Sequence, residues 1–270
     1  MTDGIIRGFF ENEKIEYYAA LDYKNVREIN PRIRERHSLD AKSVIIFLVP
    51  YYAGKTENLS KYSAARDYHL YIKDVTARLI SILRDLYPDN NFVGFGDHSP
   101  IDERSAALAA GLGILGDNGL LINEKYGTYV FLADVISDLA PEKLGVKEPK
   151  ELERCEGCGA CRTACPTGIL AGKSSECLSA ITQKKGDLSD EEVSLMKKYN
   201  TVWGCDACQD FCPHNINPKT TPIDFFLECR IEHLTGDILN SMSDEEFSKR
   251  AFAWRGRKTV ARNLEFFENN

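Results

Sequence analysis

The chain has 270 residues, of which 43% are hydrophobic and 28% are charged, and its formal net charge at pH 7 is −7. This composition is typical of a globular protein with one large core and a smaller module. No apolar run approaches the ~18 residues of a membrane span, the N-terminus does not resemble a secretory signal, and the net negative charge argues against nonspecific nucleic-acid binding by the chain as a whole.

The first half of the chain predicts strands alternating with helices. Residues 1–42 are rich in charge and predict helix and loop. Residues 43–52 form a continuous apolar, β-branched run, which is typical of a strand covered on both faces. Apolar residues then recur at intervals of three and four from about 67 to 86, which predicts an amphipathic helix.

Two more strands follow, at 91–97 and 129–137, with a short Ala-rich helix beginning near Ser105. Strands alternating with helices indicate an α/β sandwich. A polar segment, 141–153, then connects to the cysteine-rich part of the chain.

Three glycines, Gly111, Gly113 and Gly116, match the spacing of a dinucleotide fingerprint. That fingerprint needs a strand before it and a helix after it, because the pyrophosphate rests on the helix N-terminus. Here the Ala-rich helix comes first. The glycines therefore predict a helix C-terminus and a loop, through which backbone can approach a large planar ligand closely.

The cysteines predict two iron–sulfur clusters. Cys155, Cys158, Cys161 and Cys165 are spaced C-x2-C-x2-C-x3-C with Pro166 next. In proteins with this motif the first three thiolates hold one [4Fe–4S] cluster and the fourth holds another.

A second, shorter motif supplies further ligands at Cys205, Cys208 and Cys212, followed by a proline. A full copy would have a cysteine at 202, where the chain has Val202, so Cys177 is the nearest unused thiol. Counting then assigns one cluster to Cys155, Cys158, Cys161 and Cys212, and the other to Cys165, Cys177, Cys205 and Cys208.

Zinc and disulfides are the alternatives. Zinc sites use pairs of C-x2-C motifs and need neither a third cysteine in register nor a trailing proline, and disulfides need an oxidising compartment. Free thiols and clusters lead us to expect a cytoplasmic protein. The ninth cysteine, Cys229, is expected to be a buried free thiol.

A basic run lies near the C-terminus. It contains no acid, includes Trp254, and has six bases: Lys249, Arg250, Arg255, Arg257, Lys258 and Arg262. Such a run can neutralise phosphates while the aromatic ring stacks on a base, so RNA is one interpretation. A solvated helix face is the other.

The succession of motifs resembles the epoxyqueuosine reductase family. The resemblance rests on the segments KYSAARDYH, GDHSPIDER, AGLGILGDNGLLI, both cysteine motifs and RGRKTVARN, and it covers the chain from about Ser43 onward. It implies a cobalamin-dependent enzyme of queuosine biosynthesis. A nitroreductase-like α/β module would hold cobalamin against a two-cluster ferredoxin-like module, and the sequence stops at Asn270, where the family's helical-repeat domain would begin.

The resemblance also assigns roles to residues. Asp97 would be the acid that protonates the departing epoxide oxygen. The alternative interpretation is that Asp97 only caps the turn before Pro100. The family pattern implies cobalamin contacts at Asn118, Leu121, Ser179, Gln183 and Asp206. We expect His98 to be a surface histidine, His69 not to ligate cobalt, and Glu103 and Arg104 to pair with each other.

We therefore expect three parts: a cobalamin-binding catalytic module at 1–145, a two-cluster module at 146–230 and a basic helical segment at 231–270. The expected partners are the anticodon region of tRNA and an external electron donor such as a flavodoxin or ferredoxin system. The alternative functions are a two-cluster electron-transfer protein, or a corrinoid-dependent reductase of another substrate.

Overall fold

The structure is a computed structural model that describes residues 2–268. In it the chain forms two compact units. The first unit contains the chain up to residue 50 together with 69–157, and the second contains 51–68 and the chain from 158 onward. These units do not coincide with the predicted boundaries. Segment 51–68 belongs with the cluster region, and the C-terminal helices are part of the same unit.

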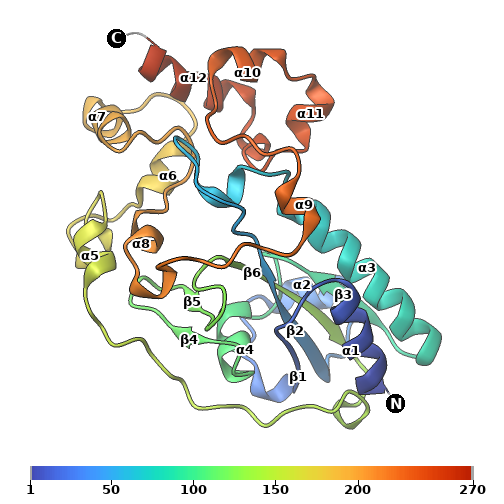
Figure 1. The fold of residues 1–270 in the computed structure, drawn as a ribbon. Coiled ribbons are helices and arrows are strands. Elements are labelled where there is room, and N and C mark those ends of the chain that lie inside the picture. The colour runs from blue at the N-terminus through green and yellow to red at the C-terminus, as the bar shows by residue number, and fades with distance from the viewer. Residues whose placement is uncertain (1, 269–270) are drawn as a thin grey trace. The chain divides into compact units, whose positions relative to one another are not determined.

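The first unit is built on a four-stranded sheet in the order β1-β2-β6-β3 (Figure 1). The strands are β1 (Tyr18–Asp22), β2 (Ser43–Pro50), β3 (Phe92–Phe95) and β6 (Val130–Ser137), and each pair of neighbours is antiparallel. The three predicted strands are confirmed. The prediction of only helix and loop before residue 43 was wrong, because β1 is a short edge strand with two buried positions.

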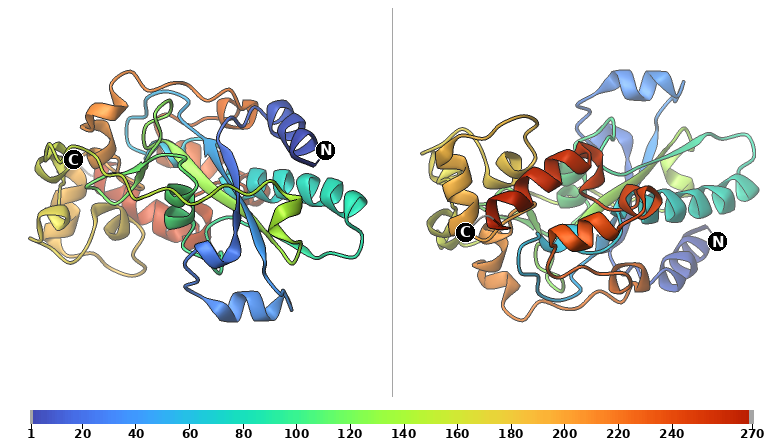
Figure 2. Two further views of the ribbon diagram at one scale, coloured as in Figure 1. Left: turned by 90° about the horizontal axis from the view of Figure 1, so that it is seen from below. Right: turned by 90° about the horizontal axis from the view of Figure 1, so that it is seen from above.

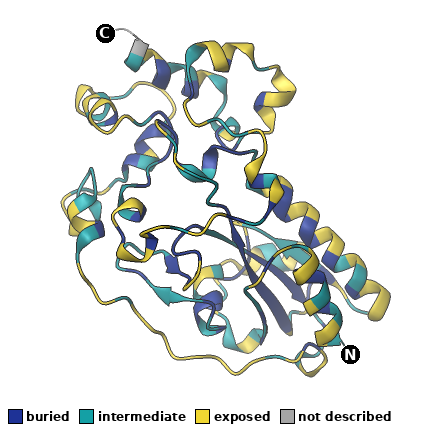
Figure 3. Ribbon diagram, in the orientation of Figure 1, coloured by how far each residue is buried: buried dark blue, intermediate teal, exposed yellow. Residues whose placement is uncertain are grey.

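Strand β2 is buried along its whole length, as its sequence predicts (Figure 3). Its alternate residues face two different layers. Val44, Ile46 and Leu48 pack in one cluster with α4 (Glu103–Ala109), while the ring of Phe47 lies 5.1 Å from that of Phe10 on α1 (Thr2–Asn12). The sheet is therefore covered on both faces.

Helix α3 (Tyr68–Leu86) packs on β3 through two glycines, on the same side of the sheet as α1 (Figure 1). A Cβ atom at Gly94 would lie 2.6 Å from the Thr76 Cβ, and one at Gly96 would lie 2.7 Å from an Ile72 methyl carbon. These glycines allow close contact between helix and strand. The unit also contains α2 (Pro31–Arg36) and a hairpin of β4 (Ile114–Leu115) and β5 (Leu121–Ile122).

Short helices make up most of the second unit, and the longest of them, α12 (Arg257–Glu268), lies beside α10 (Gly236–Ser241) (Figure 2). The remaining helices are α5 (Ala160–Ala164), α6 (Leu178–Thr182), α7 (Asp190–Lys198), α8 (Ala207–Asp210), α9 (Asp224–Leu227) and α11 (Asp244–Ser248). Their core is centred on Trp203 and Phe252, both fully buried. Of the helices within residues 2–268, none has the length and apolar character needed to cross a membrane.

Asn263 on α12 ties the two halves of the cluster region together. Its side-chain amide donates to the Thr182 carbonyl at 2.7 Å and to the Val202 carbonyl at 2.8 Å, and the residue is fully buried. Thr182 follows the first cysteine motif and Val202 precedes the second. One buried amide therefore holds both segments in register.

Replacing Asn263 with Ala should lower the free energy of unfolding by about 2–4 kcal/mol, because two buried carbonyls lose their donor. Anaerobic urea titration of the cluster-loaded protein measures this. The exposed neighbour Lys258, replaced by Ala, is the control and should change stability by less than about 0.5 kcal/mol. Equal midpoints for the two variants would contradict this role.

Candidate functional site

The first cysteine motif lies in a loop that left-handed glycines allow to turn tightly. Gly157 and Gly159 have φ of 67° and 78°, and α5 begins directly after them. Cys155 lies at the end of the first unit, where its Sγ accepts the Asp117 N–H at 3.3 Å. Cys158, Cys161 and Cys165 belong to the second unit.

Cys165 is surrounded by hydrogen-bond donors. Burial raises the pKa of its thiol, but the backbone N–H groups of Leu170, Thr167 and Gly168 and the Thr167 hydroxyl outweigh burial and lower that pKa. Donors that favour a thiolate are typical of cluster ligands, whose potential they tune. This thiol is the one that the spacing assigns to the second cluster.

Cys177, Cys205 and Cys208 form a group of interacting thiols. Burial, followed by the neighbouring thiols, raises the pKa of Cys208 to about 12 and that of Cys205 to about 11. Cys177 acts on both of these thiols, and Cys165 acts on Cys205. Buried thiols that repel one another's negative charge suit a metal site, since bound metal deprotonates them. The donor set fits the predicted second cluster.

Gly204 sets the position of Cys205. It has φ of 77°, and a Cβ atom there would lie 2.0 Å from the Ser60 Oγ, so neither the conformation nor the space admits a side chain. Its N–H donates to the Thr182 hydroxyl at 3.0 Å. Val202, where a full motif would have a cysteine, is fully buried in the core.

All nine cysteines lie within the described residues, and none of them forms a disulfide. In the part of the chain that the structure describes, no three His, Cys, Asp or Glu side chains lie close enough to hold one metal ion. A [4Fe–4S] cluster does not need such a group, because each thiolate binds a different iron of the cube.

The prediction that Cys229 is buried was wrong. It is exposed, with φ of 52°, in the turn after α9, where its carbonyl accepts a hydrogen bond from Arg250 at 2.6 Å.

Asp97 lies in a tight turn directly after β3. Its φ is 72°, a left-handed conformation that is uncommon for a residue with a side chain. The Asp97 N–H donates to Glu103 Oε1 at 3.3 Å, and Asp97 Oδ2 lies 3.3 Å from His69 Nε2 on α3. The carboxyl group of Asp97 is half exposed.

The neighbours of Asp97 have different roles from those expected. Glu103 accepts the Asp97 N–H, whereas the Arg104 side chain donates to the Gly119 carbonyl, so the predicted pairing of Glu103 with Arg104 was wrong. The two side chains are consecutive on a helix, where neighbouring residues do not face each other. His98 is exposed, as expected.

The glycine segment of the first unit follows a helix end, as predicted, but it continues as the β4–β5 hairpin, which was not predicted. Helix α4 ends at Ala109, and Gly111 then has φ of 72°. Two of the predicted cobalamin contacts lie on this hairpin. Asn118 is half-buried, and its side-chain oxygen accepts the Leu120 N–H at 3.2 Å, while Leu121 is buried in the core.

The other three predicted cobalamin contacts lie in the second unit. Gln183 donates to the Ser179 hydroxyl at 3.1 Å, and both residues are half-buried. The carboxyl group of Asp206 accepts the Lys61 N–H at 2.6 Å and the Gln209 amide at 3.0 Å, and it pairs with the Lys61 ammonium. Hydroxyl and amide groups such as those of Asn118, Ser179 and Gln183 suit the amide-rich rim of a corrin.

Most of the basic C-terminal run serves the fold. Arg257 donates to the carbonyls of Leu239 and Met242. Arg262 donates to those of Lys184 and Gly186. Arg250 donates to the carbonyls of Ala64 and Cys229, and Lys249 pairs with Glu245. Backbone carbonyls thus bind three of the six bases, and an ion pair holds a fourth.

Trp254, which lies within the same run, is exposed. Its ring is 59% exposed, and the Arg255 guanidinium lies 3.8 Å from the ring centroid.

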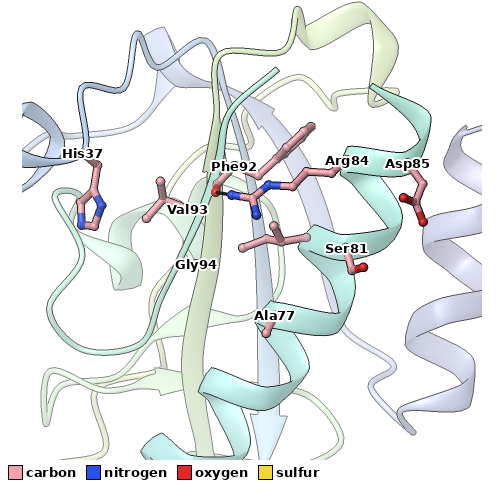
Figure 4. Close-up of a pocket in the computed structure, with 9 residues that line it drawn as sticks. His37, Ala77, Ser81, Arg84, Asp85, Phe92, Val93 and Gly94 are labelled. Atoms are coloured by element: carbon pink, nitrogen blue, oxygen red, sulfur yellow. Dashed lines mark hydrogen bonds between the residues drawn. The ribbon is translucent and has the colours of Figure 1, made fainter. Parts of the chain in front are cut away.

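A separate cavity of about 560 Å³ lies in the first unit between α3 and β3 (Figure 4). Arg84 and Asp85 come from the helix, Phe92 and Val93 come from the strand, and His37 lies at the far side. None of the predicted site residues lines this cavity.

The cysteine arrangement and the mixed α/β unit define the class: a two-cluster iron–sulfur oxidoreductase. Residues 154–215 match the sequence model of the 4Fe-4S double cluster binding domain. Among curated relatives, the epoxyqueuosine reductase of Staphylococcus aureus is 31% identical over 93% of this chain and 70% of its own length. That of Leadbetterella byssophila is 33% identical over 93% of this chain and 85% of its own.

Solved structures have the same fold. Epoxyqueuosine reductase from Streptococcus thermophilus superposes with a TM-score of 0.80 at 23% identity, covering 98% of this chain and 80% of that one. An epoxyqueuosine reductase solved with an epoxyqueuosine-modified tRNA-Tyr stem loop has a TM-score of 0.78 at 22% identity, covering 98% and 81%.

The chain belongs to the epoxyqueuosine reductase family. It is an oxidoreductase whose cofactors are two [4Fe–4S] clusters and cobalamin.

Replacing Cys177 with Ala should remove the second cluster and reduce iron from about eight to about four atoms per chain, because Val202 offers no replacement ligand. Iron and sulfide analysis after anaerobic reconstitution measures this. Cys229→Ala is the matched control and should keep all the iron, since its thiol lies outside both motifs. Full iron content in Cys177→Ala would contradict the assignment.

Proposed function

We propose that this chain reduces epoxyqueuosine to queuosine in tRNA, with Asp97 as the acid that protonates the departing oxygen. Conversion of the epoxide to an alkene consumes two electrons and two protons and releases the oxygen as water. When bound, cobalamin would supply a strong nucleophile or reductant for this chemistry, and single electrons can reduce it again. The protein must supply the proton.

The position of Asp97 is the observation that carries this proposal. Strands β2 and β3 both lie antiparallel to β6, so they run in the same direction and their carboxyl ends lie on the same side of the sheet. Asp97 follows the carboxyl end of β3. Its strained turn is held by Glu103 and His69, and strain of this kind is often found at functional sites.

A loop aspartate also agrees with a solved relative. One structure of the Bacillus subtilis enzyme has its catalytic loop, which bears an aspartate, swung out of the active site. Asp97 is on a turn, whereas the buried Asp134 is in the middle of β6 and cannot move without breaking the sheet. Asp97 is therefore the better candidate for the acid.

The cobalamin site in this proposal uses Asn118 and Leu121 of the hairpin, and Ser179, Gln183 and Asp206 of the cluster unit. The polar side chains would bind the corrin amides, and at Leu121, whose side chain is buried in the core, only the hairpin backbone would approach the ring. The first unit then corresponds to a nitroreductase-like module, which its central sheet with helices on both faces supports. The eight cysteines would hold the two clusters, which would carry electrons from a flavodoxin or ferredoxin system in the cytoplasm.

For RNA binding we place the contact at Trp254 and Arg255. A guanidinium stacked on an exposed indole is a suitable surface for an unstacked base. The run's other arginines, Arg250, Arg257 and Arg262, bind the chain's own carbonyls, so they are less available to phosphates.

Asp97→Asn should reduce kcat by about 10²–10⁴-fold, the usual contribution of a general acid, because an amide cannot donate the required proton. Turnover of an epoxyqueuosine-modified stem loop, with iron and cobalt content measured in parallel, tests this. His98→Ala is the adjacent control and should retain wild-type turnover. An Asp97→Asn enzyme with normal cofactors and normal kcat would remove Asp97 from the mechanism.

Trp254→Ala should raise KM for the tRNA by roughly tenfold with little change in kcat, since stacking is worth about 1–3 kcal/mol per base. Tyr199 is a matched control, because it is an exposed ring in the same unit with the Lys198 ammonium 5.5 Å from its centroid. Tyr199→Ala should leave KM unchanged. Equal effects of the two substitutions would argue against a base-stacking role for Trp254.

A further inference from the structure

A second pocket, of about 380 Å³, lies along helix α4 in the first unit and has no role in the chemistry described so far. Its volume is at the lower end of the range for small-molecule sites, roughly 300–1,000 Å³. The lining of this α4 pocket combines cations with apolar side chains, from the loop after β1, from α4, from β4 and from the linker before the cysteine motif: Arg27, Arg104, Leu108, Leu115, Lys150 and Leu152.

Backbone hydrogen bonds hold the segments that surround the α4 pocket at both ends of the helix. At its start, the Asp102 N–H donates to the Arg27 carbonyl at 2.9 Å. At its end, the Lys150 N–H donates to the Ala109 carbonyl at 2.7 Å. The walls are therefore fixed by main-chain contacts rather than by mobile side chains, and the pocket is preformed, as small-molecule sites usually are.

The linker turns its cation toward the pocket and its acids away from it. The Leu115 N–H donates to the Glu153 carbonyl at 2.9 Å, which holds the linker beside β4. In an extended segment, alternate side chains point to opposite sides. Lys150 and Leu152 accordingly line the pocket, whereas the exposed side chains of Glu151 and Glu153 do not.

The α4 pocket has more positive than negative charge, although the net charge of the chain is −7. The lining contains three cations and one acid, and that acid, Asp102, pairs with Arg27. Arg104 donates to the Gly119 carbonyl. Within residues 2–268, neither Arg104 nor Lys150 forms an ion pair with a carboxylate. Two cations without a counter-ion, facing one small space, make it a site for an anion.

Gly111 allows the Lys150 side chain to lie against the backbone beyond the end of α4. Gly111 has φ of 72°, and a Cβ atom there would lie 2.6 Å from both Cδ and Cε of Lys150. The aliphatic stem of the lysine thus rests on this glycine, and part of the rotamer freedom that a surface lysine loses on binding an anion is already lost. This is a physical role for the first glycine of the segment that does not involve a dinucleotide fingerprint.

The remaining lining is apolar. Leu108 is buried in the core cluster beneath α4, and Leu115 is half-buried against the same cluster. Leu152 is 54% exposed, so a ligand that covers it would gain hydrophobic free energy. An inorganic anion would use only the cations. A nucleotide would use both parts of the lining, because it joins a phosphate to a planar, largely apolar base.

We propose that the α4 pocket binds a nucleotide, with its phosphate at Arg104 and Lys150 and its nucleoside against Leu152. Arginine and lysine are the usual partners of phosphate, through charge-assisted hydrogen bonds. Two sources present this chemistry: a free mononucleotide, or one nucleotide of an RNA strand. The RNA source rests on the proposed function, and it places the strand on the helix whose first residue, Glu103, accepts the Asp97 N–H.

Equilibrium binding to the cofactor-loaded protein tests the proposal, with adenosine 5′-monophosphate and a labelled single-stranded RNA hexamer as probes. Lys150→Gln should weaken binding of at least one probe by about tenfold or more, the usual effect of losing a hydrogen bond to a charged group. Lys147→Gln is the matched control, because Lys147 is an exposed base of the same linker outside the pocket lining. It should change either affinity by less than about twofold, since solvent and salt screen distant charges.

Two further readouts separate direct contact from a general defect in folding. For RNA, Lys150→Gln should make the slope of log K against log salt shallower by about 0.7, because one phosphate contact is lost. Leu152→Ser should weaken binding of the same probe by about fivefold, through lost apolar contact. It should leave the affinity for inorganic phosphate, measured by competition, at the wild-type value.

The probe that loses affinity identifies the source of the nucleotide. Loss for the mononucleotide alone indicates a free nucleotide, loss for RNA alone indicates the RNA strand, and loss for both indicates a pocket that accepts either. The proposal is wrong if wild type binds neither probe, if Lys150→Gln binds both as tightly as wild type, or if Lys147→Gln weakens binding equally.

Failure of this proposal and failure of the proposed function are distinguishable, because binding is measured without turnover. If the chain does not reduce epoxyqueuosine but its mononucleotide affinity depends on Lys150, the proposed function is wrong and the nucleotide site stands. If turnover depends on Asp97 while Lys150→Gln changes neither affinity, the nucleotide site is wrong and the proposed function stands.

Discussion

The second cysteine motif is one ligand short of a full copy. The cluster region therefore depends on a cysteine from another part of the chain. Val202 occupies the position of the missing ligand in the core, so we assign the remaining thiolate to Cys177, on a different segment. Two hydrogen-bonded ties bring the segments into register: the Gly204 N–H donates to the Thr182 hydroxyl, and Asn263 donates to the carbonyls of both segments. Buried polar groups of this kind are costly if one partner is missing. The C-terminal helix α12 is therefore part of the metal centre's support.

The sheet of the first unit gives the proposed acid its position. β3 ends where Asp97 turns back, and the turn is held from two sides: Glu103 at the start of α4 accepts the Asp97 N–H, and His69 on α3 faces the Asp97 carboxyl group. Helix α4 is itself packed on the apolar face of the sheet. A rigid scaffold thus positions a group that is itself half exposed.

Local patterns in the sequence were enough to predict the long elements and the double cluster domain. The long elements, β2, α3 and β6, have strong periodicity or unbroken apolar runs. The cysteine spacing by itself indicates iron–sulfur clusters. β1 and the short helices of the cluster unit were not predictable, because their conformation comes from tertiary contacts. The same is true of segment 51–68, which joins the cluster unit through contacts such as Lys61 with Asp206. One signal was missed: an acid inside the apolar run 129–137 already marked Asp134 as unusual.

The central claim is that this chain, with its own cofactors, removes the epoxide oxygen from epoxyqueuosine in tRNA. The most direct test is a single-turnover reaction of the anaerobically reconstituted protein, pre-reduced, with an epoxyqueuosine-modified stem loop, followed by mass analysis of the released nucleoside. We predict loss of one oxygen atom per chain, dependent on both cobalamin and intact clusters. A protein with about eight irons and stoichiometric cobalamin that leaves the epoxide unchanged would contradict the account.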